Sequence, residues 1–185
     1  MNERQFFKAR LYSTAIAAIA IWVLLAWNYF DGGIPRHHLL ADKDLPAISN
    51  VWGALLIPLL TWFLTHLIQK KAFDKEAGTA DSSEVLQAEV YGFAGALLFG
   101  AVLSAFFTFG YPDICGYMML GLLASALFFP LYRAGCFLGY VFGMTFTFGA
   151  VLPTLIGTLL GLMAFVIYRF IRGGILYAWS KLGSA

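Results

Sequence analysis

Six long apolar windows, separated by short polar segments, limit what this chain can fold into. A helix that crosses a bilayer needs about 20 largely apolar residues, or about 17 at the short end. The windows that meet this requirement are residues 11–30, 51–68, 90–109, 114–132, 134–152 and 153–168. Only 12% of the residues are charged, whereas soluble domains have about 25%. We therefore predict an all-α, polytopic integral membrane protein, built as one transmembrane domain with a bundle of six helices over residues 1–185.

Two polar segments are long enough to form loops of some size. Residues 31–50 follow the first window, and residues 69–89 follow the second. The fifth and sixth windows adjoin each other, which predicts a very tight turn between them. Pro153 suits the first turn of the sixth helix, because a backbone N–H has no helical partner at that position.

Lysine and arginine predict the orientation of the bundle, because they are enriched in short cytoplasmic loops. With the N-terminus inside, the outer segments hold only Arg36 and Lys43. The cytoplasmic segments hold ten basic residues: Arg4, Lys8, Arg10, Lys70, Lys71, Lys75, Arg133, Arg169, Arg172 and Lys181. This ratio favours N- and C-termini that are both cytoplasmic. We expect the protein in the plasma (inner) membrane of a prokaryotic cell.

Membrane lipids are the partners that this composition implies. The net charge is +2, and no basic run is long enough to bind nucleic acid, so we expect no nucleic-acid partner. The sequence is compatible with a homo-oligomer and with an assembly that includes partner subunits. It specifies no cofactor.

Rows of small residues predict close helix contacts, because small side chains let helix backbones approach each other in a membrane. The fifth window has Gly135, Gly139 and Gly143 at four-residue spacing. The sixth has Gly157 and Gly161, and the third has a row from Gly92 through Ala96 and Gly100 to Ser104. We expect at least the fifth and sixth helices to pack through these rows.

The interiors of the windows hold almost no ionisable residues, although such residues usually mark functional sites in membranes. His66 is the one candidate, and its place within a turn of Lys70 predicts a solvated position at the cytoplasmic edge. Glu89 and Asp113 are placed at span ends, and Arg10 in the N-terminal flank. The chain has no CxxC pair, GxSxG elbow, HExxH helix or nucleotide-binding loop. Hydroxyls such as Thr145 and Thr147 either bond to their own backbone or line a solute path.

The segment IPRHHLLADKDLPAISN, residues 34–50, gathers histidines and carboxylates. Pro35 can begin a helix over 36–43, on which His38 and Asp42 share a face at four-residue spacing. That pair can bind a divalent metal or act as a base and its orienting group. The candidate catalytic residues are His37, His38, Asp42 and Asp44, and any metal would use His38 and Asp42. A solvated interfacial cap and a binding or gating loop are the other interpretations.

Three functions are compatible with these features. The first is transport or binding of a small or lipophilic solute, with the candidate contacts Asp31, His38, Asp42, Asn50, Asp113, Thr145 and Thr147. The second is a membrane-embedded enzyme that acts on lipid through the histidines and aspartates at the outer leaflet. The third is a structural or regulatory subunit of a membrane complex. The absence of a catalytic motif favours a protein that is not an enzyme.

Overall fold

A computed structural model describes residues 2–33, 36–38, 47–73 and 82–182 of the chain. Most of these residues are helical. The α-helices are α1 (Glu3–Phe30), α2 (Gly53–Phe73), α3 (Ser82–Thr108), α4 (Pro112–Ser125), α5 (Ala134–Phe148), α6 (Val151–Val166) and α7 (Arg172–Leu182). A 3-10 turn, η2 (Asn50–Trp52), leads into α2, and a π-helical turn, η4 (Ile167–Ile171), joins α6 to α7. The prediction of an all-α chain is confirmed.

Four helices are long and apolar enough to cross a membrane. They cover Glu3–Phe30, Asn50–Phe73, Ser82–Thr108 and Val151–Ile175, and between 17% and 28% of their most apolar windows is buried within the chain. The remaining apolar surface faces outward, as the lipid of a bilayer requires. The other two predicted spans form shorter helices, with 14 residues in α4 and 15 in α5.

Several predicted boundaries are wrong by a few residues. The fourth helix ends at Ser125, and turns replace the predicted helix up to residue 132, around Pro130. The fifth ends at Phe148, because Gly149 has a φ of 71° that leaves the helical region. The sixth begins at Val151, so the turn is as tight as expected, and Pro153 lies in the first turn of α6.

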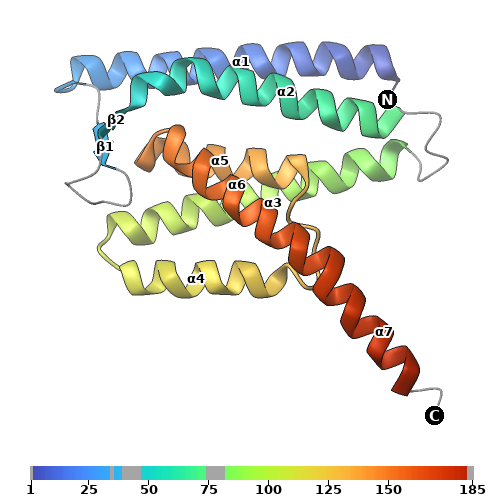
Figure 1. Ribbon diagram of the computed structural model, residues 1–185. Coiled ribbons are helices and arrows are strands. Elements are labelled where there is room, and N and C mark those ends of the chain that lie inside the picture. Colours follow the sequence, from blue (N-terminus) through green and yellow to red (C-terminus); the bar gives the residue numbers. More distant parts are fainter. Residues whose placement is uncertain (1, 34–35, 39–46, 74–81, 183–185) are drawn as a thin grey trace.

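The helices form two pairs that lie against each other, one antiparallel and one parallel (Figure 1). The first pair is α1 with α2, and the second is α3 with α5. α6 contacts α5, and α4 contacts α3 and α6. α7 continues the direction of α6 through η4 and extends away from the bundle (Figure 1). The N-terminus lies at the end of the bundle opposite the short strands β1 (Arg36–His38) and β2 (Ala47–Ser49) (Figure 1).

The second pair is held at a backbone-to-backbone contact that we call the glycine seam, formed by Gly135, Gly139 and Gly143 against α3. A Cβ atom added to Gly139 would collide with the carbonyl oxygen of Phe93, and one added to Gly143 with that of Leu97. The predicted row on α3 faces the same seam, since Ser104 Oγ donates to the Gly143 carbonyl at 3.4 Å.

The expected partner of the glycine row was therefore wrong: it is α3 rather than α6. α6 does approach α5 at Gly157, where an added Cβ would lie 3.1 Å from the Tyr140 ring. A Cβ atom added to Gly161 would meet no atom within 4 Å. α3 therefore occupies the face of α5 that carries the glycines.

The core fills the half of the bundle near β1 and β2. Its members come from both pairs and from the α5–α6 turn: Ala17, Ile21, Leu25, Ile57, Leu103, Tyr140, Val141, Met144 and Ala150. Gly53 at the start of α2 brings α2 to this turn, because a Cβ there would lie 3.3 Å from the Ala150 Cβ. In this half the two pairs are joined by side-chain packing.

The predicted helix over 36–43 is wrong at its beginning. Residues Arg36–His38 form the strand β1, which pairs antiparallel with β2, Ala47–Ser49, in the register His37 with Ile48. Strand pairing satisfies backbone groups that a helix would have satisfied internally. Ser49 then caps η2, since its Oγ accepts from the Val51 amide at 3.3 Å.

Candidate functional site

A cavity of about 300 Å³ lies between the two helix pairs, in the half of the bundle that the core does not fill. We call it the Arg10 cavity. Its lining residues come from four helices: Phe6, Ala9, Arg10, Ser13, Thr61, Thr65, Ile68, Leu86, Glu89, Val90, Phe93, Gly135, Leu138 and Phe142. Ligand sites are mostly apolar clefts with a few convergent polar groups, in the range of about 300–1,000 Å³. The Arg10 cavity fits this description at its small end.

Arg10 is the charged group on the α1 wall of the cavity. Arg10 is only 7% exposed, although it lies outside the apolar window 11–30. The guanidinium carbon lies 3.6 Å from the centre of the Trp62 ring. A cation over an aromatic face is attracted by about 0.5–2 kcal/mol, with the larger value where water is excluded. Trp62 therefore holds one face of the guanidinium.

One nitrogen of Arg10 is fixed by α2. Nη1 lies 3.0 Å from His66 Nδ1 and donates to Gln69 Oε1 at 3.2 Å. Arginine has no acceptor, so Nδ1 of His66 is the acceptor in this contact. Trp62, His66 and Gln69 share a helical face because they are spaced by four and three residues. His66 is exposed and is also a partner of Arg10.

The other edge of Arg10 has no partner among the described residues. Nε is buried and makes no hydrogen bond, and no acceptor is found for Nη2. An unpaired buried N–H of a charged group costs more than the roughly 1–3 kcal/mol of a neutral one. The arrangement therefore leaves donors of a cavity-lining side chain unused.

Glu89 is the charged group on the opposite wall, on α3, and it is 3% exposed. Both of its oxygens have partners: Oε1 lies 3.0 Å from Lys71 Nζ, and Oε2 accepts from the Gly135 amide at 2.8 Å. Gly135 is in the first turn of α5, whose N-cap residue Arg133 makes no capping hydrogen bond of its own. Glu89 thus caps α5 from another helix, where a carboxylate also favours the helix dipole.

The charges of the cavity do not balance. Lys71 neutralises Glu89, while no carboxylate in the described part of the chain forms an ion pair with Arg10. An unpaired charge is strongly disfavoured in a low-dielectric interior. The wall therefore carries a net positive charge at Arg10 and attracts a negatively charged group.

The hydroxyls at depth mostly bond to their own helices. Thr145, a predicted substrate contact, donates to the Val141 carbonyl at 2.6 Å, and Thr61 in the cavity donates to Ile57 at 2.8 Å. Thr147 is half-buried. Neither Thr145 nor Thr147 lines the Arg10 cavity. Their hydroxyls give the cavity no ligand contact, so this part of the predicted binding set is not brought to the site.

The other predicted site residues belong to the opposite end of the bundle (Figure 1). Asp31 is the exposed C-cap of α1, and Asp113 lies exposed in the first turn of α4. Asn50 packs its side chain against the backbone of Gly149.

Two of the four residues proposed for catalysis, His37 and His38, fall in the same region. The backbones of His37 and His38 form β1, and Asp42 and Asp44 lie outside the described residues. A strand at 36–38 removes the helical spacing that would place His38 and Asp42 on one face. Within residues 2–33, 36–38, 47–73 and 82–182, no three metal-binding side chains gather in one place.

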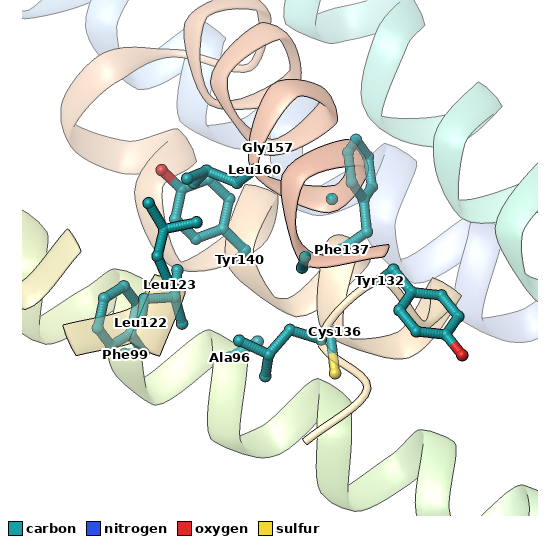
Figure 2. A pocket seen from close by; sticks show the side chains of 13 residues that line it. Ala96, Phe99, Leu122, Leu123, Tyr132, Cys136, Phe137, Tyr140, Gly157 and Leu160 are labelled. Atoms are coloured by element: carbon teal, nitrogen blue, oxygen red, sulfur yellow. The ribbon is translucent and has the colours of Figure 1, made fainter. Parts of the chain in front are cut away.

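A second hollow lies between α3, α4, α5 and α6 (Figure 2). It has a volume of about 60 Å³ and is lined almost entirely by apolar groups, among which the buried Tyr140 hydroxyl makes no hydrogen bond. Figure 2 shows the hydroxyl of Tyr132 pointing away from the other labelled side chains. Its volume equals that of a few water molecules, since one needs about 10–15 Å³, but its apolar walls offer them few hydrogen-bond partners. The Arg10 cavity has a buried charged residue on each of two facing walls, so we take it as the candidate site.

Comparison of the chain with protein-family models, curated proteins and solved structures finds no match. The geometry of the chain's own residues therefore carries the functional argument.

Proposed function

We propose that the protein is a small integral membrane protein that binds a small or lipophilic solute in the Arg10 cavity and transports it. The observation that carries the proposal is the cavity itself, about 300 Å³ between two helix pairs. Its apolar walls suit a lipophilic body, and its few polar groups suit one specific contact. Alone or with copies and partner subunits, the chain would perform this role without a catalytic centre.

The two halves of the bundle support transport rather than storage alone. The core joins the two pairs near β1 and β2, whereas the pairs separate around the cavity at the other end. Transporters often work by rocking one bundle against another around a site between them. The α1–α2 pair and the α3–α5 pair are suitable rigid units, because each is held by more extensive contacts than those that join them.

The topology that we propose has six membrane-crossing segments and both termini on the cytoplasmic side of a prokaryotic plasma membrane. In addition to the four long helices, α4 and α5 would cross as short, tilted or partly shielded segments. The Arg10 cavity then lies in the cytoplasmic half, because Arg10, Lys71 and Arg133 belong to that side by the excess of basic residues. Reporter fusions at residue 185 and within 34–50 should read cytoplasmic and external, respectively.

The binding proposal is tested by filling the cavity. Ala9 lines it, whereas Ala15 is exposed on the same helix outside it. Ala9→Trp should abolish ligand binding, and Ala15→Trp should leave it unchanged. The measurement is the melting temperature in nanodiscs with a panel of ten-carbon amphiphiles, because a ligand at one hundred times its dissociation constant adds about 2.7 kcal/mol of stability.

Uptake of the stabilising compound into proteoliposomes would then separate transport from binding alone. A panel in which no amphiphile raises the melting temperature of the unmodified protein would contradict the proposal. Equal loss of binding in Ala9→Trp and Ala15→Trp would also contradict it, because the two variants differ in their position relative to the cavity.

A further inference from the structure

The guanidinium of Arg10 is held so that one pair of its donors remains free. Trp62 covers one face at 3.6 Å, and Nη1 is occupied by His66 and Gln69. The free edge consists of Nε and Nη2, whose N–H bonds are parallel. This edge matches the two oxygens of a carboxylate or phosphate in a bidentate contact. Because Nε is covered by protein atoms, a bidentate contact requires a small shift of the Arg10 side chain toward the cavity that it lines.

The surroundings favour an anion over any other polar group. Arg10 is 93% buried and has no carboxylate partner in the described ranges, while Glu89 on the facing wall is already paired with Lys71 and the Gly135 amide. A neutral hydroxyl or amide could accept from one N–H but would not neutralise the charge. An anionic oxygen group would satisfy both donors and the charge together.

We infer that the solute of the Arg10 cavity is an anionic amphiphile whose carboxylate or phosphate oxygens bind the Nε–Nη2 edge of Arg10. Its apolar chain lies against the aromatic and aliphatic lining, in which Phe93, Leu138 and Phe142 take part. This inference rests on the proposed function, because it names the class of solute that the same cavity binds.

The test compares decanoate with 1-decanol, which has the same chain length and no charge. Binding is measured by calorimetry with the protein in phosphatidylcholine nanodiscs, for the unmodified chain, Arg10→Met, Arg10→Lys and the control Arg4→Met. Arg4 is an exposed arginine on the same helix. We expect decanoate to bind the unmodified protein and Arg4→Met about tenfold to a hundredfold more tightly than decanol, as charge-assisted hydrogen bonds allow.

Arg10→Met should lose this preference while it still binds decanol, which also shows that the cavity is intact. Arg10→Lys keeps the positive charge but lacks the two parallel N–H donors of a guanidinium. It should therefore retain about a tenth of the preference for decanoate over decanol. If Arg10→Met fails to fold, Arg10→Lys tests the inference. A preference of Arg10→Lys for decanoate equal to that of the unmodified chain would exclude bidentate binding.

The outcomes separate the two proposals. Binding of neither compound to the unmodified protein would contradict the proposed function. Equal binding of decanoate and decanol would leave that function standing and overturn the anion inference, as would a decanoate preference that survives in Arg10→Met. Competition by phosphatidylglycerol in the nanodisc would identify a lipid head group as the source of the anion, and its absence a free lipophilic acid. Both of these results support Arg10 as the receptor.

Discussion

The glycine seam and the Arg10 cavity are two contacts of the same helix, α3, and they are built in opposite ways. At the seam, α5 approaches until an added Cβ would collide with backbone atoms of α3. At the cavity, α1 and α2 stand away from α3, and the space between them holds a buried arginine with unused donors. The seam is typical of a structural contact and the cavity of a binding site. Substitutions at the seam should therefore change stability, whereas substitutions at the cavity should change binding.

The largest expected effect is at the seam. Gly139→Leu places a side chain where the backbone of Phe93 and Leu97 already lies, so α3 and α5 must separate. Overpacking of this kind costs about 3 kcal/mol or more. The matched control is Gly116→Leu on α4, because no atom lies within 4 Å of a Cβ at Gly116. The melting temperature in nanodiscs should fall for Gly139→Leu alone, and equal values for the two variants would contradict the distinction between these sites.

The second-largest loss of stability is expected at Glu89, which lines the Arg10 cavity and also contacts Gly135 of the glycine seam. Glu89→Leu leaves the Gly135 amide without its acceptor at the start of α5, which we expect to cost about 1–3 kcal/mol. The ion pair with Lys71 adds little, because that side chain is 54% exposed. Hydrogen exchange at the Gly135 amide should accelerate in Glu89→Leu. It should stay slow in the control Glu84→Leu, which removes an exposed carboxylate from the first turn of α3.

Arg10 should behave differently from both. Arg10→Met removes the contact with Trp62 and two hydrogen bonds, but it also removes a buried charge that has no carboxylate partner in the part of the chain that is described. These effects have opposite signs, so the unfolding free energy without ligand should change by less than about 1 kcal/mol. Chemical denaturation in mixed micelles measures it. A loss as large as that of Gly139→Leu would show that Arg10 is mainly structural.

The smallest effect is expected at Thr145, a residue that the sequence offered as a solute contact. Its hydroxyl bonds to Val141 within the same helix. Thr145→Val keeps the shape and leaves one carbonyl that still accepts its helical N–H, so stability should change by less than about 1 kcal/mol. The affinity for decanoate should not change. A clear loss of affinity would place the solute at Thr145 and away from the Arg10 cavity.

The fold was readable where the sequence is strongly patterned. Apolar windows located the helices, and glycines at four-residue spacing on two windows predicted a close contact. The partner of the row on α5 was predicted wrongly, because nothing in the spacing of Gly135, Gly139 and Gly143 distinguishes α3 from α6.

The candidate site was mostly missed, because its charged residues lie beside the apolar windows and not within them. Arg10 precedes the window 11–30 by one residue and was counted as a flank, yet α1 begins at Glu3 and buries it. Glu89 lies one residue before the window 90–109 and was treated in the same way. One signal was present: Trp62, His66 and Gln69 recur on one face of α2. Nothing in the sequence pairs that face with Arg10, since the contact spans 56 residues.

The cap that Glu89 provides to α5 has a consequence for how the chain is made. The carboxylate and the Gly135 amide are 46 residues apart, and the acceptor comes first. During synthesis α3 leaves the ribosome before α5, so the carboxylate is already present when the amide emerges. An unsatisfied amide in an apolar environment costs several kcal/mol, and this order of synthesis shortens the time that α5 spends in that state. A circular permutant that places α5 ahead of α3 would reverse the order and slow insertion while leaving every contact of the finished protein available.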